Sequence, residues 1–370
     1  MRPLTVAIDA SRTTAARRTG TENYALRLLR ALLALEAPHH YHLYFRDPPP
    51  PDLFPARPNV SLHVLPWPRM WTHTRFAAAL WRARPDVTFV PAHTLPLWFP
   101  GAAVVTVHDL GYRHFPQAHP GFARHYLEWS TRYSARRATR VLADSKATAR
   151  DLAAFYRVPP EKVTVVYPGV DETLAPVTSA ERLAAVRQRY GLPERYLLFL
   201  GTLQPRKNVA RLVQAYARWR AQTSAPDVAL VLAGQRGWLY DPAWTAGVEG
   251  VILTGYVDDA DIPALYSGAL ALVFPSLYEG FGFPVLEAMR CGTPVIASAT
   301  SSLPEVAGDA ALLVDPRDVD AIAQAMARVV GDAALRAELS ARGHAQARRF
   351  NWARAAERTL QALEAAAGVR

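Results

Sequence analysis

Two carboxylates, Glu279 and Glu287, stand eight positions apart in FPSLYEGFGFPVLEAMRCGTPVIAS, residues 274–298. Pro284 lies between them and predicts a helix over 284–291, because proline suits the first helical turn. Glu279 then lies in the loop before the helix and Glu287 in its first turn. Two intervening glycines let the backbone approach a ligand, and their N–H groups can donate to hydroxyls or phosphate oxygens. Two acids around such a turn suit a polyol ligand.

A second candidate group follows a predicted strand at 196–203. Arg206 and Lys207 stand at the start of a helix predicted over 208–221, with Asn208 as its expected N-cap. Two cations beside a helix start form a seat for a diphosphate. A solvated basic pair is the alternative at this point.

Other polar residues have a simpler interpretation. His108 ends a predicted strand at 103–110, where it is either a packed histidine or a functional one. The histidines within 39–42 belong to the start of a strand rather than to a metal cluster. The D-x-D patterns at 259–261 and 318–320 precede helical segments and are expected to be N-caps.

The elements that position these residues alternate between strand and helix patterns. Continuous apolar runs predict parallel strands covered on both faces. Two doubly wound, Rossmann-like α/β domains facing each other across a cleft are therefore expected. Strands are predicted at 4–10, 41–46, 60–66, 87–92, 103–110, 140–145, 163–170, 196–203, 227–234, 250–257, 269–276, 293–299 and 311–316, and helices at 21–35, 120–137, 208–221, 259–268, 283–291, 318–331 and 351–368.

The domain boundaries follow from this pattern. A polar segment at 171–195 is the predicted linker, so the first domain covers 1–180 and the second 181–350. Residues 351–370 form a closing helix expected to pack back on the first domain. Ligands of such sheets bind beyond the carboxyl ends of the strands, where both candidate groups lie.

Composition limits the class of protein. The 370 residues suffice for two domains, and an apolar content of 50% argues against disorder. No apolar run approaches the roughly 18 residues of a membrane span, and the first ten residues predict a strand rather than a signal peptide. Cys291, the one cysteine, excludes a disulfide framework and fits a reducing cytoplasm.

The net charge of +10 is concentrated in the first half. Residues 1–180 hold 22 Lys+Arg and 13 Asp+Glu, a balance of +9, which favours an anionic partner. Segment 67–84, WPRMWTHTRFAAALWRAR, interleaves aromatic residues with arginines. It suits an anionic membrane surface or, alternatively, a helix with its tryptophans in the core. A nucleic-acid binder would explain the charge but neither glutamate.

Several ordered blocks, GTLQPRKN, YEGFGFPVLEAMRCGTPVIAS, GYVDDADIPALYSGA, SSLPEVAGDAALLVDP, TVHDLGYRHFPQAHP, ADSKATARDL and VTVVYPGVD, resemble the retaining, nucleotide-sugar-dependent glycosyltransferases of the GT-B fold. Together these blocks, which include the E-x7-E region, cover most of residues 100–330. They are most similar to the glycosyltransferase family 4-like, mannosyltransferase-like branch. A dinucleotide-binding dehydrogenase would need a third glycine, where Val285 stands.

The resemblance implies a role for each matching residue. Glu279 would contact the donor sugar and stabilise its positive charge, Glu287 would hold the ribose, and Arg206 with Lys207 would bind the diphosphate. Further donor contacts would come from the backbone of Phe281, Gly282 and Phe283, from main-chain groups at Val257 for the base, and from His108 and Gly20 of the first domain. Thr202 stands where many members have arginine, which puts that phosphate contact in doubt.

The resemblance also implies a reaction. A hexose would pass with retained configuration from a nucleotide sugar, with GDP-mannose favoured, to a lipid-linked or cell-surface glycan. A donor phosphate oxygen would act as the base. No cofactor and no metal are expected, because Arg206 and Lys207 would neutralise the leaving group. The protein is expected in the cytoplasm, peripheral to the inner membrane face. A UDP-sugar glucosyl- or GlcNAc-type transferase, a sugar-nucleotide epimerase and a phosphorylase of the same fold are the alternatives.

Overall fold

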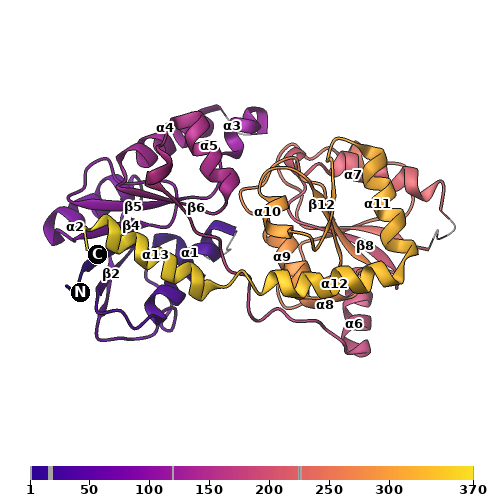
Figure 1. The fold of residues 1–370 in the computed structure, drawn as a ribbon, viewed down its shortest axis with the longest axis horizontal. Helices are drawn as coiled ribbons and strands as arrows, with labels where there is room; N and C mark the ends of the chain where they lie inside the picture. Colours follow the sequence, from indigo (N-terminus) through magenta and orange to yellow (C-terminus); the bar gives the residue numbers. More distant parts are fainter. Residues whose placement is uncertain (1, 16–19, 119–120, 224, 226, 370) are drawn as a thin grey trace. The chain divides into compact units, whose positions relative to one another are not determined.

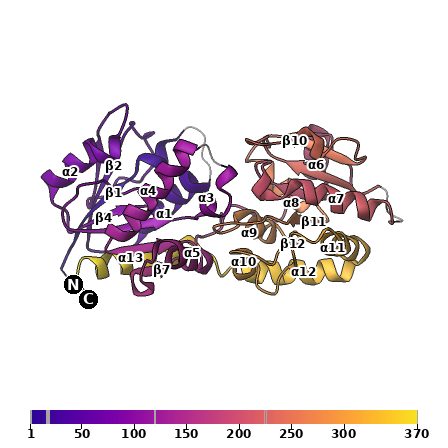
Figure 2. The same ribbon diagram turned by 90° about the horizontal axis from the view of Figure 1, so that it is seen from above.

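The computed structural model of the chain describes residues 2–15, 20–118, 121–223, 225 and 227–369. These residues divide into two compact units, each built on one parallel sheet. Unit 1 comprises 1–113, 119–169 and 350–370, and unit 2 comprises 114–118 and 170–349. Figures 1 and 2 show both units from two directions.

Unit 1 contains a seven-stranded sheet in the order β3-β2-β1-β4-β5-β6-β7. The order reverses between β1 and β4, which is the pattern of a doubly wound fold. All of its pairings between neighbouring strands are parallel. The strands are β1 (Thr5–Asp9), β2 (His40–Phe45), β3 (Val60–Val64), β4 (Val87–Val90), β5 (Ala102–Val107), β6 (Arg140–Ala143) and β7 (Val163–Val165).

Helices cover both faces of the unit 1 sheet. Figure 1 shows α4 and α5 on one side and α1 and α13 on the other. Parallel strands enclosed in this way are buried on both faces, as in β4, where all four residues are buried. The helices are α1 (Gly20–Ala34), α2 (Arg75–Ala83), α3 (Gly111–His114), α4 (Gly121–Arg137), α5 (Lys146–Tyr156) and α13 (Trp352–Ala366), where α3 ends at the first residue assigned to unit 2.

The C-terminal helix α13 is part of unit 1. It packs against α1 and strands β4 to β6. His39 is fully buried, and its Nε2 lies 3.1 Å from Oε1 of Glu364 on α13. Trp352 closes against Gly169, where an added Cβ would come within 2.4 Å of the Trp352 nitrogen.

Unit 2 contains a six-stranded parallel sheet in the order β10-β9-β8-β11-β12-β13, which reverses between β8 and β11. Figure 1 shows α7 and α11 on one face and α9 and α12 on the other. The strands are β8 (Tyr196–Leu200), β9 (Ala229–Ala233), β10 (Val251–Gly255), β11 (Ala271–Phe274), β12 (Val295–Ser298) and β13 (Leu312–Val314). The helices are α6 (Ala180–Tyr190), α7 (Val209–Arg220), α8 (Ile262–Ser267), α9 (Phe283–Arg290), α10 (Leu303–Ala307), α11 (Val319–Gly331) and α12 (Ala333–Ala347).

The predicted linker at 171–195 contains helix α6, and the D-x-D expectation is only half right. Asp318 caps α11 by accepting the N–H groups of Asp320 and Ala321. The Asp261 carboxylate instead accepts from Arg182, Arg189 and Tyr190 of α6, so it ties α6 to α8. Asp261, the residue that holds α6 in place, lies about 70 residues further along the chain than the α6 side chains it contacts.

No helix within the described residues is long and apolar enough to cross a membrane.

Candidate functional site

The carboxyl ends of β8 and β11 bring the two candidate groups of unit 2 together. β11 pairs directly with β8, with Ala271 opposite Leu197. The loops that follow these strands therefore leave the same edge of the sheet, at the point where the strand order reverses. Ligands of open α/β sheets bind at such a point, because the loops diverge there.

Arg206 and Lys207 lie on a short 3-10 turn, η5 (Pro205–Lys207), between β8 and α7. Asn208 follows in a left-handed conformation with a φ of 61°. Its side chain does not cap α7, contrary to expectation. Asn208 is buried, and its Nδ2 donates to the carbonyl oxygens of Pro275 and Pro316 at 3.0 and 2.6 Å. The asparagine thus fixes the cation-bearing turn to the loops that follow β11 and β13.

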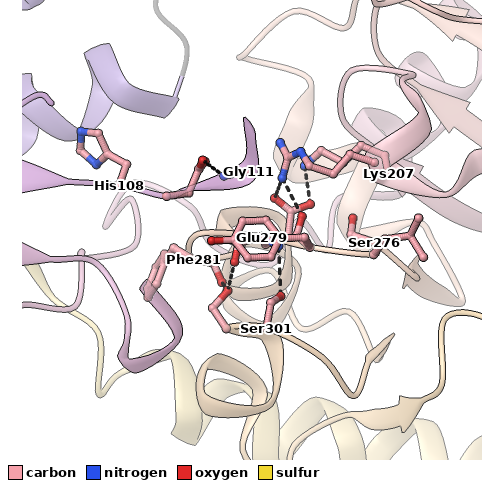
Figure 3. A network of polar contacts seen from close by, with 12 residues as sticks. His108, Gly111, Lys207, Ser276, Glu279, Phe281 and Ser301 are labelled. Carbon is pink, nitrogen blue, oxygen red and sulfur yellow. Dashed lines mark hydrogen bonds and ion pairs between the residues drawn. The ribbon is translucent and has the colours of Figure 1, made fainter. Parts of the chain in front are cut away.

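Glu279 binds both of these cations. Its Oε1 lies 2.7 Å from Nζ of Lys207, and its Oε2 lies 3.0 Å from Nη1 of Arg206. Figure 3 shows Glu279 below Lys207, with dashed lines marking these contacts. Glu279 is 6% exposed. Burial alone would raise the pKa of Glu279, but the charges of Arg206 and Lys207 outweigh it and hold the pKa below its usual value.

The turn between Glu279 and α9 is fixed by two serines. The backbone N–H of Glu279 donates to Oγ of Ser301 at 3.0 Å. The Ser302 hydroxyl lies 3.0 Å from the carbonyl oxygen of Glu279 and 2.7 Å from that of Phe281. Figure 3 shows Ser301 beneath Glu279 and Phe281. Both serines belong to the SSLPEV block, 21 to 23 residues beyond the groups they contact, so no pattern in the sequence connected them with this turn.

Gly282 is required at the entrance of α9. Its φ is +112°, and an added Cβ would lie 2.5 Å from Cδ2 of Leu303. The helix begins at Phe283, with proline in its first turn as predicted. The rings of Phe281 and Phe283 meet edge to face at 5.1 Å.

Glu287 lies in the second turn of α9, not in the first as predicted, because the helix begins at Phe283. Its Oε2 accepts the hydroxyl of Tyr266 on α8 at 3.0 Å. Burial and the Glu287 charge raise the pKa of Tyr266 well above its usual value, so this hydroxyl keeps its hydrogen. Val257 follows β10 and is buried, and Thr202 follows β8 and is exposed.

His108 lies at the end of β5 in unit 1, and both its ring nitrogens have partners. Nδ1 lies 2.7 Å from Oδ2 of Asp144, and Nε2 lies 3.1 Å from the carbonyl oxygen of Pro91. A carbonyl can only accept, so Nε2 carries a hydrogen. Burial alone would lower the pKa of His108, but the Asp144 carboxylate more than offsets it and the pKa is raised. Sequence reasoning missed Asp144, which lies in the ADSKATARDL block.

Gly20 is exposed and is the first residue of α1, one residue before the start of the helix predicted at 21–35. Residues 16–19 before it lie outside the described residues. No group of three His, Cys, Asp or Glu side chains in the described part of the chain is arranged to hold a metal ion.

Two family models match this chain over its two halves. A model described as Glycosyltransferase Family 4 matches residues 18–174, and one described as Glycosyl transferases group 1 matches residues 185–346. Together with the two Rossmann-like sheets, they define the class: the chain belongs to the GT-B glycosyltransferases, in their mannosyltransferase-like branch. The predicted GT-B glycosyltransferase family and the predicted pair of Rossmann-like α/β domains are thereby confirmed.

Individual relatives make the likeness more specific. The O-antigen chain mannosyltransferase B of Escherichia coli is 38% identical over 268 residues, which cover 71% of this chain and 70% of that protein. The serotype-specific mannosyltransferase WbdA of Escherichia coli is 32% identical over 250 residues, but the match spans only 30% of its length. Sucrose-phosphate synthase from Thermosynechococcus elongatus has a similar structure, with a TM-score of 0.73 at 25% identity over 97% of this chain and 98% of that one.

Proposed function

We propose that the protein transfers a mannosyl group from GDP-mannose to a glycan or lipid-linked acceptor with retained anomeric configuration. The observation that carries the proposal is the group formed by Glu279, Arg206 and Lys207 at the reversal point of the unit 2 sheet. The mannosyltransferase names of the relatives support mannose as the sugar.

Charge separation explains why these residues suit the reaction. As the sugar–phosphate bond breaks, negative charge grows on the diphosphate and positive charge on the ring. Arg206 and Lys207 would neutralise the diphosphate, and Glu279 would face the ring. Each preorganised partner of this kind is typically worth about 3 kcal/mol of barrier.

The remaining site residues would orient the donor. Glu287 would hold the ribose hydroxyls, the backbone of 281–283 would hold sugar and phosphate, and main-chain groups at Val257 would read the base. His108 and Gly20 would contribute from unit 1. The two fixed cations make a divalent metal unnecessary, and a donor phosphate oxygen would deprotonate the acceptor hydroxyl.

Calorimetry with a panel of nucleotide sugars in EDTA tests the donor. GDP-mannose should bind and should turn over slowly to mannose and GDP. Binding of a UDP-sugar in its place would replace the donor but keep the reaction class. Binding of NAD or nucleic acid with no nucleotide sugar would contradict the proposed function.

Segment 67–84 supports a membrane-facing acceptor. Trp71 and Phe76 are buried in the core of unit 1, so the core alternative holds for them. Trp67 and Trp81 are exposed by 41% and 50%, and the Arg75 guanidinium lies 4.4 Å from the Trp67 ring centre. Exposed tryptophan beside arginine suits the interface of an anionic bilayer. On this basis we place the acceptor at the inner membrane face.

Replacing Trp67 and Trp81 together by serine should weaken binding to anionic liposomes at low salt. The control is Trp238→Ser, which changes a similarly exposed tryptophan of unit 2. Cosedimentation with vesicles of phosphatidylglycerol measures the effect. If wild-type protein stays in the supernatant, the membrane part of the proposal fails.

A further inference from the structure

Glu279 forms ion pairs with Arg206 and Lys207, the two cations that the proposed function assigns to the donor diphosphate. Each of its carboxylate oxygens contacts one cation, Lys207 at 2.7 Å and Arg206 at 3.0 Å. The side chains of Arg206 and Lys207 are only 20% and 11% exposed. A ligand phosphate that reaches these cations therefore meets a carboxylate already bound to them.

The cations themselves are held in place. Nη1 of Arg206 also donates to the carbonyl oxygen of Tyr278 at 2.6 Å. Nζ of Lys207 lies 4.8 Å from the centre of the ring of Phe274, the last residue of β11. The Asn208 side chain fixes the turn that carries both residues. Exchange of the anion therefore requires movement of the Glu279 side chain more than of the cations.

The backbone of Glu279 is equally fixed, while its side chain has rotatable bonds. Ser301 and Ser302 hold the N–H and carbonyl groups of Glu279. Rotation about the side-chain bonds can move the carboxylate while the turn that begins α9 stays in place. The movement is therefore local to one side chain.

We propose that Glu279 is an internal counter-ion that the donor diphosphate displaces, so that its carboxylate turns to the sugar only once a diphosphate is seated. The inference rests on the proposed function, because it takes Arg206 and Lys207 as the diphosphate ligands. A diphosphate carries more negative charge than one carboxylate and so competes for the cations. It also repels the carboxylate beside it, and both effects favour the exchange.

The exchange makes the orientation of the Glu279 carboxylate toward the sugar depend on donor binding. Without a diphosphate, the Glu279 carboxylate is paired with the two cations and does not face a sugar ring. With the diphosphate bound, the same carboxylate faces the ring on which positive charge develops. The cost is a weaker affinity for nucleoside diphosphates, because binding must break two charge-assisted hydrogen bonds.

Calorimetric titration of GDP into wild-type protein, Glu279→Gln and Glu287→Gln tests the proposal. Glu279→Gln should bind GDP about tenfold more tightly, since a neutral amide does not compete with the diphosphate for the two cations as a carboxylate does. The same variant should lose turnover. Glu287→Gln is the matched control, because its carboxylate accepts from Tyr266 and would hold the ribose. It should bind GDP no more tightly than wild type.

Glu279→Asp keeps the charge on a shorter side chain that cannot reach both cations equally. It should show a smaller gain in GDP affinity, and it provides the measurement if the glutamine variant does not fold. GMP, which brings less charge, should gain less from Glu279→Gln than GDP does.

The outcomes separate this proposal from the proposed function. If wild-type protein binds GDP but Glu279→Gln binds it equally or less tightly, the counter-ion role is wrong and the proposed function stands. If wild-type protein binds no nucleoside diphosphate, the proposed function itself is contradicted.

Discussion

Arg206 and Lys207 give Glu279 an environment in which a buried carboxylate keeps its charge. Because the folded-state pKa is held below the usual value, this group contributes stability that is fully present above the ordinary carboxyl range. The contribution is lost as the pH falls through the lowered folded pKa. Glu279 is therefore ionised at neutral pH, as its proposed role in stabilising a cationic sugar ring requires.

Lys207→Met should reduce kcat with GDP-mannose by about 100-fold or more, because in the proposed reaction it removes one of the two charges that would stabilise the leaving diphosphate. Lys207→Arg should retain part of the rate. Lys162→Met is the matched control in unit 1, where Nζ contacts a backbone carbonyl. Steady-state kinetics measure the loss, and near-wild-type turnover by Lys207→Met would remove the lysine from the mechanism.

Asp144→Asn should lower the pKa of His108, because the carboxylate is the main group that raises it against burial. A raised histidine pKa contributes stability that is fully present below the unfolded value and is lost as the pH rises through the folded value. An NMR titration of the imidazole should show wild-type His108 titrating above about 6.5 and the variant below the wild type. An unchanged titration would show that Asp144 does not control the imidazole charge.

Among the elements, the loop between β11 and α9 carries Glu279 and would therefore carry the proposed chemistry. It follows a buried strand, turns at a left-handed glycine and starts a helix, and hydroxyls preceding α10 hold its backbone. A small change in this turn therefore moves Glu279 relative to both cations.

Gly282→Ala should destabilise unit 2 by about 1–3 kcal/mol and reduce turnover, because alanine is strained at this φ and its Cβ meets Leu303. Gly331→Ala is the control, since a Cβ there meets open space at the end of α11. Denaturant unfolding followed by circular dichroism measures both. Equal stability of the two variants would show that the turn tolerates a side chain.

The strand pattern was predictable because parallel strands buried on both faces are continuous apolar runs. Each predicted strand corresponds to one in the structure, and α1, α7 and α11 fall within two residues of prediction. Helix α6 was not predictable, since its Arg182 and Arg189 find Asp261 only after folding. Proline at 284 indicated the start of α9, but the helix begins one residue earlier, at Phe283, so Glu287 is its fifth residue and lies in the second turn.

The same limit applies to the site. The residue types of Glu279, Arg206 and Lys207 after two strands predicted that they would meet at one edge of the sheet. Their mutual ion pairs were not predictable, because the partner of each charge depends on loop conformation. The role of Asn208 was wrong for the same reason: a residue suited to cap a helix instead ties three loops together.

Across the whole molecule, residues 114–118 belong to unit 2, and the chain passes from unit 1 to unit 2 again at 169–170 and returns at 349–350. The proposed donor-binding residues of the E-x7-E region and the cations all lie in unit 2. The first 180 residues carry most of the net charge, which would suit an anionic acceptor in the proposed reaction.

Proton NMR of the reaction with GDP-mannose in EDTA tests whether the transfer retains the anomeric configuration and proceeds without a metal. The anomeric proton of the newly formed mannoside, or of mannose released in the first minutes, should show the configuration of the donor, and turnover should be unaffected by EDTA. An inverted product, or a strict requirement for added Mg²⁺, would contradict a metal-free retaining transfer by Glu279, Arg206 and Lys207.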